Sequence, residues 1–273
     1  MRIGRREFAP GRTYVMGILN VTPDSFSDGG RYVDASSALR RTEEMIREGA
    51  DIIDIGGEST RPGSVPVDVA EEMRRVLPVI GAIRKKYDVP ISLDTYHAQT
   101  AEAGLDAGAD LINDIHGLAD PAMTRVAAQH HAAVCLMHDR DMSEASDLIR
   151  EIREDLRAIR ERALAAGIDK EQILLDPGVG FGKDREQNLQ ILARLSEFQG
   201  LGAPVLLGAS RKSVIGRTLD LPENERLEGT LATTAAAVWA GCLFVRVHDV
   251  KENVRMIRML EAIRAYGDRK QEG

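Results

Sequence analysis

Polar and ionisable side chains stand at intervals along the 273-residue chain, each directly after a short apolar run. The clearest case is the segment ILLDPGVGFGK, residues 173–183, in which an apolar run ends at Asp176 and a glycine-rich loop follows. Such a run is typical of a parallel strand covered on both faces, so the Asp176 carboxylate should stand where a strand leaves the core. A carboxylate at that depth needs donors, which either its own loop amides or a ligand could supply.

The same pattern recurs at other run ends. In order, the residues that follow the runs are Asn20, residues 58–61, Asp94, Asn113, His138, Asp176, residues 210–213, and Arg246 with His248. Taken singly, an Asn or Asp at such a position could be a helix N-cap, and this alternative stays open. Taken together, polar residues at the ends of all eight apolar runs indicate one site, because active sites of parallel barrels lie at the C-terminal ends of the strands.

The first group of side chains suits a flat heterocycle. Asp94, Asn113 and Asp176 could hold the edge of a ring that presents adjacent N–H donors, because a carboxylate accepts two parallel hydrogen bonds. Lys212 could donate to a carbonyl or nitrogen of the same ring. His138 could be either a wall of this site or a structural hydrogen-bonding residue.

The second group suits an anion. Arg246 and His248 end the last run and become neighbours of Asn20 on the first run once the sheet closes. Asn20 could donate to the anion or give an oxygen to Mg²⁺. Ser213 should begin a short helix, whose N-terminal amides favour a carboxylate or a phosphate.

The elements that must position these residues alternate regularly. Strands are expected at residues 14–19, 51–55, 89–93, 110–115, 133–137, 172–175, 204–207 and 242–247. Helices are expected at residues 35–48, 69–86, 98–107, 121–130, 143–166, 185–197, 226–240 and 250–266. Eight such units predict an α/β fold, a single (β/α)8 TIM barrel with its active site at the C-terminal ends of the strands. The alternative, a doubly wound open sheet, usually has a G-x-G-x-x-G motif after its first strand, and this chain has none there.

We expect one domain over residues 1–273, with a short N-terminal extension at 1–13 and a frayed tail at 267–273. The formal net charge of −7 argues against nucleic acid or an anionic membrane as the main partner. Cys135 and Cys242 lie in apolar runs outside any C-x-x-C motif, so we expect reduced core thiols in a cytoplasmic protein. No apolar run approaches the length of a membrane span, and the first residues do not resemble a signal peptide.

Two polar loops carry aromatic or basic residues that have no core to join. NVTPDSFSDGG, residues 20–30, contains Phe26, and GGESTRPGS, residues 56–64, contains Arg61. Phe181 lies in a third loop of this kind. We interpret the first two loops as lids that pack on an aromatic substrate. The alternative is that each loop folds on its own side chains.

With these motifs assembled, the chain resembles the dihydropteroate synthase family of pterin-binding enzymes. The shared segments run in family order from residue 17 to 250 and include TPDSFSDGG, LLDPGVGFGK and SRKS. The resemblance implies a transferase of folate biosynthesis, in which p-aminobenzoate displaces pyrophosphate from 6-hydroxymethyl-7,8-dihydropterin diphosphate by an SN1-like route. It also implies Mg²⁺ as cofactor, a homodimer, and sulfonamides as competitors of p-aminobenzoate.

The resemblance further assigns roles, residue by residue. The implied pterin-binding residues are Asp94, Asn113, Asp176 and Lys212. The implied diphosphate-binding residues are Asn20, Thr60, Arg246 and His248, with Asn20 also at the metal. The implied p-aminobenzoate-binding residues are Phe26, Thr60, Arg61, Pro62, Phe181, Lys212 and Ser213. The residues expected to take part in catalysis are Asp94, Lys212, Arg246 and His248.

Two other functions remain to be compared. A pterin-binding methyltransferase domain shares the barrel and the pterin acids, but it would need neither SRKS nor TPDSFSDGG, and the chain contains both. A non-catalytic relative that only binds pterin is disfavoured because the chain keeps five residues of the proposed site, namely Asn20, Arg61, Lys212, Arg246 and His248. Release of pyrophosphate that depends on p-aminobenzoate would separate the three functions.

Overall fold

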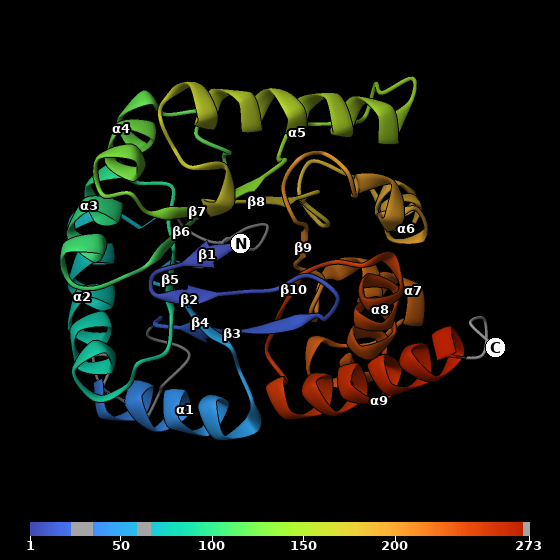
Figure 1. Ribbon diagram of the computed structural model, residues 1–273, viewed down its shortest axis with the longest axis horizontal. Helices are drawn as coiled ribbons and strands as arrows, with labels where there is room; N and C mark the ends of the chain where they lie inside the picture. The colour runs from blue at the N-terminus through green and yellow to red at the C-terminus, as the bar shows by residue number, and fades with distance from the viewer. Residues whose placement is uncertain (23–34, 59–66, 270–273) are drawn as a thin grey trace.

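The computed structural model describes residues 1–22, 35–58 and 67–269. Eight parallel strands form its centre and helices surround them (Figure 1). The strands are β3 (Tyr14–Asn20), β4 (Ile52–Gly56), β5 (Ile91–Asp94), β6 (Leu111–Asp114), β7 (Ala133–Met137), β8 (Ile173–Asp176), β9 (Leu206–Leu207) and β10 (Phe244–Val247). Their order is β8-β7-β6-β5-β4-β3-β10-β9, and a bridge between Leu175 and Val205 joins the two ends. The predicted TIM barrel is confirmed.

Each strand of the barrel is followed by a helix on its outer side (Figure 1). The helices are α1 (Ala35–Glu48), α2 (Val69–Lys86), α3 (Ala98–Asp106), α4 (Pro121–Gln129), α5 (Leu148–Ala165), α6 (Arg185–Ala193), α7 (Ser213–Leu219), α8 (Leu227–Ala240) and α9 (Val250–Arg269). Short 3-10 helices occupy Lys170–Gln172, Leu195–Phe198 and Glu223–Glu225. None of the helices in the described part of the chain is long and apolar enough to cross a membrane.

The largest differences from the predicted helix boundaries are at α5, α6 and α9. The predicted helix 143–166 begins only at Leu148, because the Asp147 side chain accepts a hydrogen bond from the Arg150 amide and caps the helix there. The predicted helix 185–197 ends at Ala193, and the chain continues as a 3-10 helix from Leu195. At the C-terminus, α9 continues to Arg269, so the first residues of the predicted tail are helical.

The first residues of the chain close one end of the barrel. They form a hairpin of β1 (Arg2–Ile3) and β2 (Arg6–Glu7), which lies across the barrel in Figure 1. Ile3 and Phe8 are buried against the lowest inward-facing side chains of the strands, including Phe244. Two residues of the expected N-terminal extension, Ile3 and Phe8, thus belong to the core.

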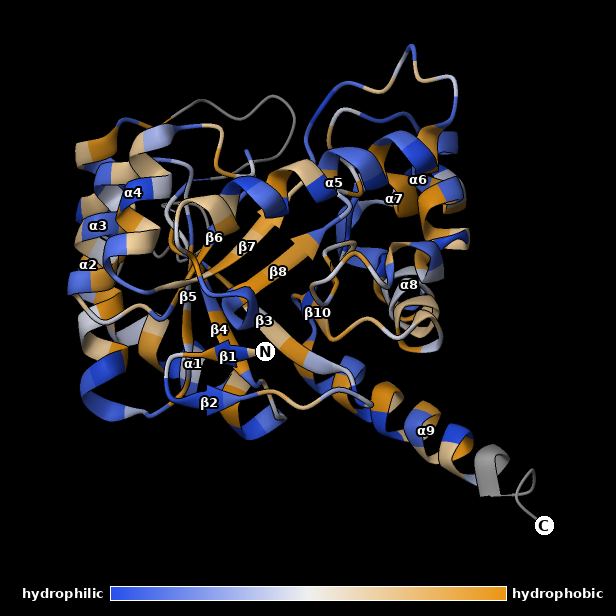
Figure 2. Cartoon of the chain, turned by 45° about the horizontal axis from the view of Figure 1, so that its top comes forward, coloured by the Kyte–Doolittle hydropathy of each residue, from blue (hydrophilic) through white to orange (hydrophobic). Residues whose placement is uncertain are grey.

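Successive side chains along each barrel strand point alternately outward, toward the helices, and inward, into the barrel. Outward-facing residues such as Val15 and Ile53 pack against the helices. Figure 2 shows how apolar the barrel strands are, with β7 and β8 largely orange. Inward-facing residues form a small apolar cluster at the bottom of the barrel, with Ile52, Leu111 and Leu174 among them. The next inward position on each of these strands, two residues later, is polar. The interior of the barrel is therefore apolar below and polar above, at the carboxyl ends of the strands.

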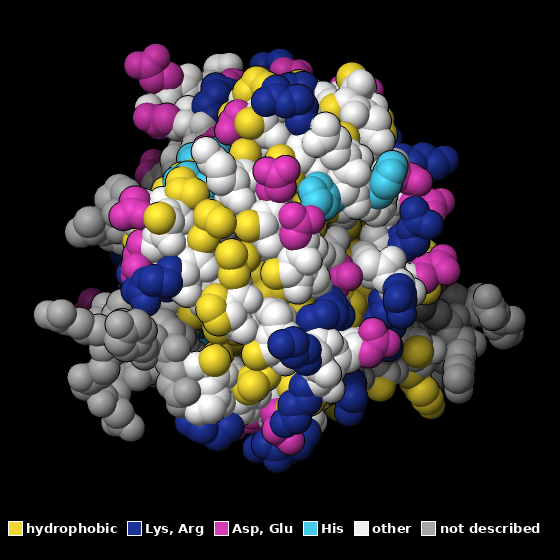
Figure 3. Space-filling view, turned by 90° about the vertical axis from the view of Figure 1, so that its left-hand side faces the viewer, with side chains coloured by type: hydrophobic (Ala, Val, Ile, Leu, Met, Phe, Trp, Pro, Cys, Tyr) yellow, Lys and Arg dark blue, Asp and Glu magenta, His cyan; other side chains and the backbone are white. Residues whose placement is uncertain are grey.

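The outer surface carries charges of both signs. Acidic and basic side chains stand among apolar ones on the face at the left of Figure 1 (Figure 3). Many of them are ion pairs within a helix, such as Arg74 with Glu71 on α2. Exposed pairs of this kind contribute little to stability, so the barrel interior and its helix contacts hold the fold together.

Candidate active site

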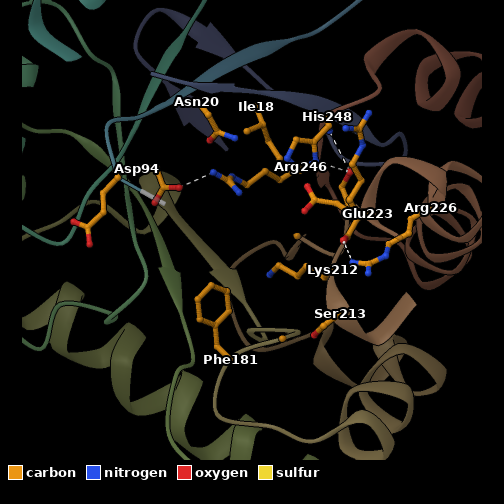
Figure 4. Close-up of a pocket in the computed structure, with 15 residues that line it drawn as sticks. Ile18, Asn20, Asp94, Phe181, Lys212, Ser213, Glu223, Arg226, Arg246 and His248 are labelled. Atoms are coloured by element: carbon orange, nitrogen blue, oxygen red, sulfur yellow. Dashed lines mark hydrogen bonds and ion pairs between the residues drawn. The ribbon is translucent and has the colours of Figure 1, made fainter. Parts of the chain in front are cut away.

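A cavity of about 200 Å³ opens at the carboxyl ends of the strands (Figure 4). Its walls are Ile18, Asn20, Glu58, Asp94, Gly180, Phe181, Gly208, Ser210, Arg211, Lys212, Ser213, Glu223, Arg226, Arg246 and His248. Seven residues predicted from the sequence are among them: Asn20, Asp94, Phe181, Lys212, Ser213, Arg246 and His248. Four others, Phe26, Thr60, Arg61 and Pro62, lie outside the described residues.

The two remaining predicted residues border the cavity from the barrel interior. Asn113 is paired in register with Asp94 on the neighbouring strand, so both side chains face the same way. Asp176 is only 5% exposed, and a Cβ atom built on Gly208 would lie 3.4 Å from its Oδ2. The glycine thus leaves room for this carboxylate beside the cavity wall. The structure therefore brings all nine described candidates to one end of the barrel.

Arg246 occupies the middle of the site and is held by two carboxylates. Its Nε donates to Asp54 Oδ2 and its Nη2 donates to Asp94 Oδ2, each over 2.6 Å (Figure 4 shows the second bond). Burial lowers the pKa of Arg246, but the carboxylates of Asp54 and Asp94 outweigh burial, so the net direction is upward. The guanidinium therefore stays charged inside the barrel.

Asp54 is a site residue that sequence reasoning missed. It is fully buried, and besides the Arg246 bond it accepts a 2.5 Å hydrogen bond from Ser92 Oγ. Its position in the sequence could have indicated this role. Asp54 lies two residues after Ile52 in an otherwise apolar strand, so both side chains must point into the barrel. A charged residue at such a position has to find a partner inside the barrel.

The Asp94 carboxyl has a strongly shifted pKa. Burial raises its pKa to about 7, and the nearby carboxylates of Asp54 and Glu72 add to the rise although Arg246 opposes it. In the folded protein the pKa of Asp94 lies above its ordinary value of 3.8, so the protonated carboxyl is the form that the fold favours. Asp94 therefore contributes most to stability at pH values below 3.8. The contribution is lost as the pH rises through about 7.

We expect this shift to make pterin affinity depend on pH. The ionised Asp94 is the form that accepts hydrogen bonds from ring N–H groups, so affinity should fall by roughly tenfold per pH unit below 7. Titration of the protein with pterin by calorimetry, between about pH 5.5 and 7.5, measures this dependence. Asp94→Asn should bind weakly with a nearly flat profile. An unchanged slope in this variant would show that another group is responsible.

Asp176 and Lys212 are two further charged groups of the site, close enough for each to affect the pKa of the other. Asp176 Oδ1 accepts a 2.7 Å hydrogen bond from the Gly178 amide, and burial raises the pKa of this carboxyl although Lys212 opposes the rise. Lys212 Nζ donates to the Val179 carbonyl over 2.6 Å and lies 4.5 Å from the centre of the Phe181 ring. Burial lowers the pKa of Lys212 to about 8. Both the loop amide and a ligand can thus satisfy Asp176, the two possibilities that the sequence left open.

His248 is positioned by a serine that was not among the predicted site residues. Ser210 Oγ lies 3.0 Å from His248 Nδ1 and also accepts a 3.2 Å hydrogen bond from the His248 amide. Ser210 comes from the segment after β9 and His248 from the end of β10, so the contact depends on the pairing of these two strands. The serine fixes the orientation of the imidazole, which the sequence could not indicate.

Three further residues that line the cavity were also given no role in the sequence prediction. Glu58 accepts a 3.0 Å hydrogen bond from the Tyr96 hydroxyl and lies at the outer edge of the cavity. Glu223 and Arg226 precede α8 and reach the cavity from the side of α7 (Figure 4). Arg226 donates to the Arg211 carbonyl over 2.9 Å, which links it to the segment that carries Lys212. Glu58 stood among the polar strand ends noted in the sequence but was given no role, and nothing in the spacing of Glu223 and Arg226 pointed to the cavity.

His138 does not line the cavity and has a structural contact instead. Its side chain is 1% exposed, and Nε2 lies 2.9 Å from Asp155 Oδ2 on α5. Burial, together with the charge of Lys183, lowers the pKa of His138 to about 4, so the imidazole is neutral. Of the two readings of this histidine, the structure favours the hydrogen-bonding one.

The site has few ligands of its own for a metal ion. Within the described part of the chain, no group of three or more His, Cys, Asp or Glu side chains could hold one. Asn20 lines the cavity and has an amide oxygen. Mg²⁺ commonly binds through one or two protein oxygens plus the phosphates of a substrate. These residues fit a magnesium ion that arrives with a diphosphate, and do not fit an all-protein metal cage.

The chain matches known proteins in sequence and in structure. A family model described as pterin binding enzyme matches residues 16–248. The chain is 52% identical over 266 residues to the dihydropteroate synthase of Clostridium beijerinckii, which covers 96% of this chain and 99% of the relative. It is 53% identical over 253 residues to that of Bacillus subtilis, with 92% and 89% covered.

The solved structures agree with these relatives. The dihydropteroate synthase of Clostridium difficile, crystallised in the presence of pteroic acid, is 50% identical and superposes with a TM-score of 0.91. The match covers 94% of this chain and 99% of that one. Family match, identity and superposition all extend over nearly the whole barrel, including the strand ends that carry the acids and Arg246. The chain therefore belongs to the pterin-binding enzyme family, among its dihydropteroate synthases.

Proposed function

We propose that this cavity joins p-aminobenzoate to 6-hydroxymethyl-7,8-dihydropterin diphosphate, forming 7,8-dihydropteroate and pyrophosphate. The observation that carries the proposal is the convergence of Asp94, Asp176 and Lys212 with Arg246 and His248 at one end of the barrel. Related enzymes have been solved with fitting ligands. The Xanthomonas albilineans enzyme was solved with 4-aminobenzoic acid and with 7,8-dihydropteroate, and the Yersinia pestis enzyme with a sulfonamide drug.

The pterin would lie deepest, between β5, β6 and β8. The Asp176 carboxylate is suited to the paired N–H donors of the aminopyrimidine edge, because two parallel bonds match its two oxygens. Lys212 is suited to a ring carbonyl or nitrogen, and Asn113 to both donors and acceptors. Asn113 and Asp176 are buried, so a ring that failed to pair with them would leave buried polar groups without partners.

The diphosphate would lie toward Asn20, Arg246 and His248. Asp54 holds the Nε side of Arg246, so the arginine keeps its place while a ligand competes for its bond to Asp94. Mg²⁺ bound with Asn20 and the phosphates would add positive charge at the leaving group. Arg246 and His248 donate hydrogen bonds to the same oxygens and stabilise the departing diphosphate.

The reaction can then proceed by an SN1-like displacement. The C–O bond to the diphosphate breaks first, and the pterin delocalises the positive charge of its methylene group. Asp94 and Asp176 stabilise this charge electrostatically. The aniline nitrogen then attacks the methylene carbon and loses a proton. No strong general base is needed, because the amine is already neutral at pH 7.

The p-aminobenzoate ring would bind between Phe181, Lys212 and Ser213, which line the outer cavity. Phe26, Thr60, Arg61 and Pro62 complete this pocket in the proposal, and they lie outside the described residues. Lys212 near Phe181 gives the pocket one aromatic wall and one cation. A sulfonamide would compete at the same place because it presents a similar aniline ring.

The direct test measures pyrophosphate release from the pterin diphosphate. Release should require p-aminobenzoate when no other aniline is present. With formation of 7,8-dihydropteroate as the readout, a sulfonamide should raise the apparent KM for p-aminobenzoate without changing the maximal rate. A pterin-binding methyltransferase or a non-catalytic relative would bind pterin without such release. Equal release with and without p-aminobenzoate would overturn the proposal.

We also propose that the protein forms a homodimer through α8 and α9 and acts in the cytoplasm. Trp239 is 56% exposed on α8, and Met259 and Ile263 are 62% and 47% exposed on α9. A cluster of large apolar side chains on two adjoining helices is a common interface. For the compartment, the support is that Cys135 and Cys242 are free and buried.

The dimer has its own test. Trp239→Glu with Met259→Glu should convert the protein from a dimer into a monomer, because the charges would have to be buried in the interface. Light scattering after size-exclusion chromatography gives the mass. Leu189→Glu on α6, where the leucine is 37% exposed, is the matched control and should remain dimeric. A wild-type protein that stays monomeric at micromolar concentration would contradict the proposal.

A further inference from the structure

Lys183 ends the loop that follows β8, and its ammonium is fully occupied by backbone carbonyls. Nζ donates to the carbonyls of His138 and Gly178 over 3.1 Å each and to that of Phe181 over 2.7 Å. An ammonium has three N–H donors, so these three bonds use all of them. Lys183 is not among the walls of the cavity, and the proposed mechanism gives it no role.

The three carbonyls join two separate segments of the chain. His138 follows β7, whereas Gly178 and Phe181 belong to the loop after β8. The loop lies so close to the first segment that a Cβ atom at Gly178 would come within 1.8 Å of the His138 carbonyl oxygen. Carbonyl oxygens enclosed between two such closely packed segments need hydrogen-bond donors, and the Lys183 ammonium supplies them.

The loop can approach so closely because of its glycines. Gly178, Gly180 and Gly182 have φ values of +71°, +88° and +57°, which residues other than glycine rarely adopt. Such a backbone has little intrinsic preference for one shape, so external contacts must fix it. Asn188 Oδ1 accepts a hydrogen bond from the Gly180 amide over 2.6 Å, and Lys183 binds both halves of the loop.

The other side of the same loop faces the cavity. Gly180 and Phe181 line the cavity, and Figure 4 shows the Phe181 ring on the same side as Lys212. Lys212 Nζ donates to the Val179 carbonyl over 2.6 Å and lies 4.5 Å from the centre of the Phe181 ring. Two lysines thus hold one loop from opposite sides, Lys212 from the cavity and Lys183 from behind.

We propose that Lys183 is a positioning residue for the aromatic amine, because its three carbonyl bonds set the place of Phe181 and of the Val179 carbonyl that orients Lys212. The inference rests on the proposed function, since it concerns the p-aminobenzoate half of that site. Asp94, Asn113 and Arg246 come from other strands, so these groups of the deeper half do not depend on this loop, whereas Asp176 and Lys212 contact it.

The test is a comparison of two substrates in the Lys183→Met variant. Its KM for p-aminobenzoate should rise about tenfold or more, since a buried carbonyl loses its donor. Its dissociation constant for the pterin diphosphate should rise far less, by about threefold or less, because Asp94, Asn113 and Arg246 come from other strands and keep their places. Lys170→Met changes an exposed lysine at the start of the 3-10 helix Lys170–Gln172, and this matched control should leave both values unchanged.

Chemical rescue distinguishes positioning by the ammonium from a general structural role. Lys183→Cys can be alkylated with 2-bromoethylamine, which restores an ammonium at nearly the length of lysine, or with iodoethane, which adds only the carbon atoms. Cys135 and Cys242 are buried and should be spared. The aminoethylated protein should regain a low KM for p-aminobenzoate and the ethylated one should not. This comparison also decides the matter if Lys183→Met fails to fold.

Three results would overturn the inference. They are an unchanged KM in Lys183→Met, an equal loss of affinity for both substrates, and equal recovery after the two alkylations. Failure of the proposed function would look different, because wild-type protein would then show no pyrophosphate release that depends on p-aminobenzoate.

Discussion

Arg246→Met is expected to lower turnover by a factor on the order of a hundred to a thousand, because the departing diphosphate loses a positioned cation. The same change should destabilise the fold. Asp54 is fully buried and Asp94 nearly so, and both would lose their partner in a medium that solvates charge poorly. Removing one member of a buried ion pair typically costs about 3–5 kcal/mol. Pyrophosphate release and urea unfolding measure the two effects.

The two effects can be separated by a second substitution. Asp54→Asn in the Arg246→Met background removes one stranded charge, so it should restore part of the stability and none of the turnover. Arg84→Met is the control, because Arg84 forms a partly buried pair with Asp110 at the opposite end of the barrel. It should lose stability with normal turnover per folded molecule. Near-full turnover in Arg246→Met would remove this arginine from the mechanism.

Asp176→Asn should weaken pterin binding by about a hundredfold or more. The amide offers one acceptor oxygen in place of two and turns a donor toward the donors of the ring, so buried polar groups are left unpaired. Stability should be kept or raised, because burial already disfavours the ionised carboxyl, as its raised pKa shows. Calorimetric titration with pterin, beside a thermal unfolding curve, gives both quantities.

Asp114→Asn is the matched control for this prediction. Asp114 is also buried at a strand end, but its carboxylate accepts hydrogen bonds from the amides of His116 and Leu118 and does not line the cavity. This variant should lose stability because the turn loses its capping group, and it should keep its pterin affinity. If both aspartate variants lost pterin affinity equally, general damage to the strand ends would explain the result better than a role for Asp176.

Much of the site could be predicted because local pattern and barrel geometry agree. The apolar runs show where strands end, and the barrel rule says that these ends meet, which was enough to select Asp94, Asp176 and Arg246. Asp54 could not be selected by the strand-end rule, because it lies in the middle of β4. Reading the period of two from Ile52 would have placed it on the inner face.

The N-terminal hairpin could not be predicted in the same way. Its two strands have two residues each, too short for a period to appear. Its role depends on Ile3 and Phe8 finding the apolar lower end of the barrel, which exists only after the strands have closed. Ser210 is a similar case, because its bond to His248 requires β9 and β10 to lie side by side.

By itself, the sequence determined the alternation of strands and helices, the barrel, the family, and which residue types stand at the strand ends, because each of these depends on local order along the chain. The tertiary structure decided which charges meet. Arg246 binds Asp54, 192 residues away, and Asp94, 152 residues away, while Lys183 binds a carbonyl of the preceding strand end. Such pairings arise when the sheet closes, since closure brings side chains from distant strands into one poorly solvated interior where each charge must find a partner.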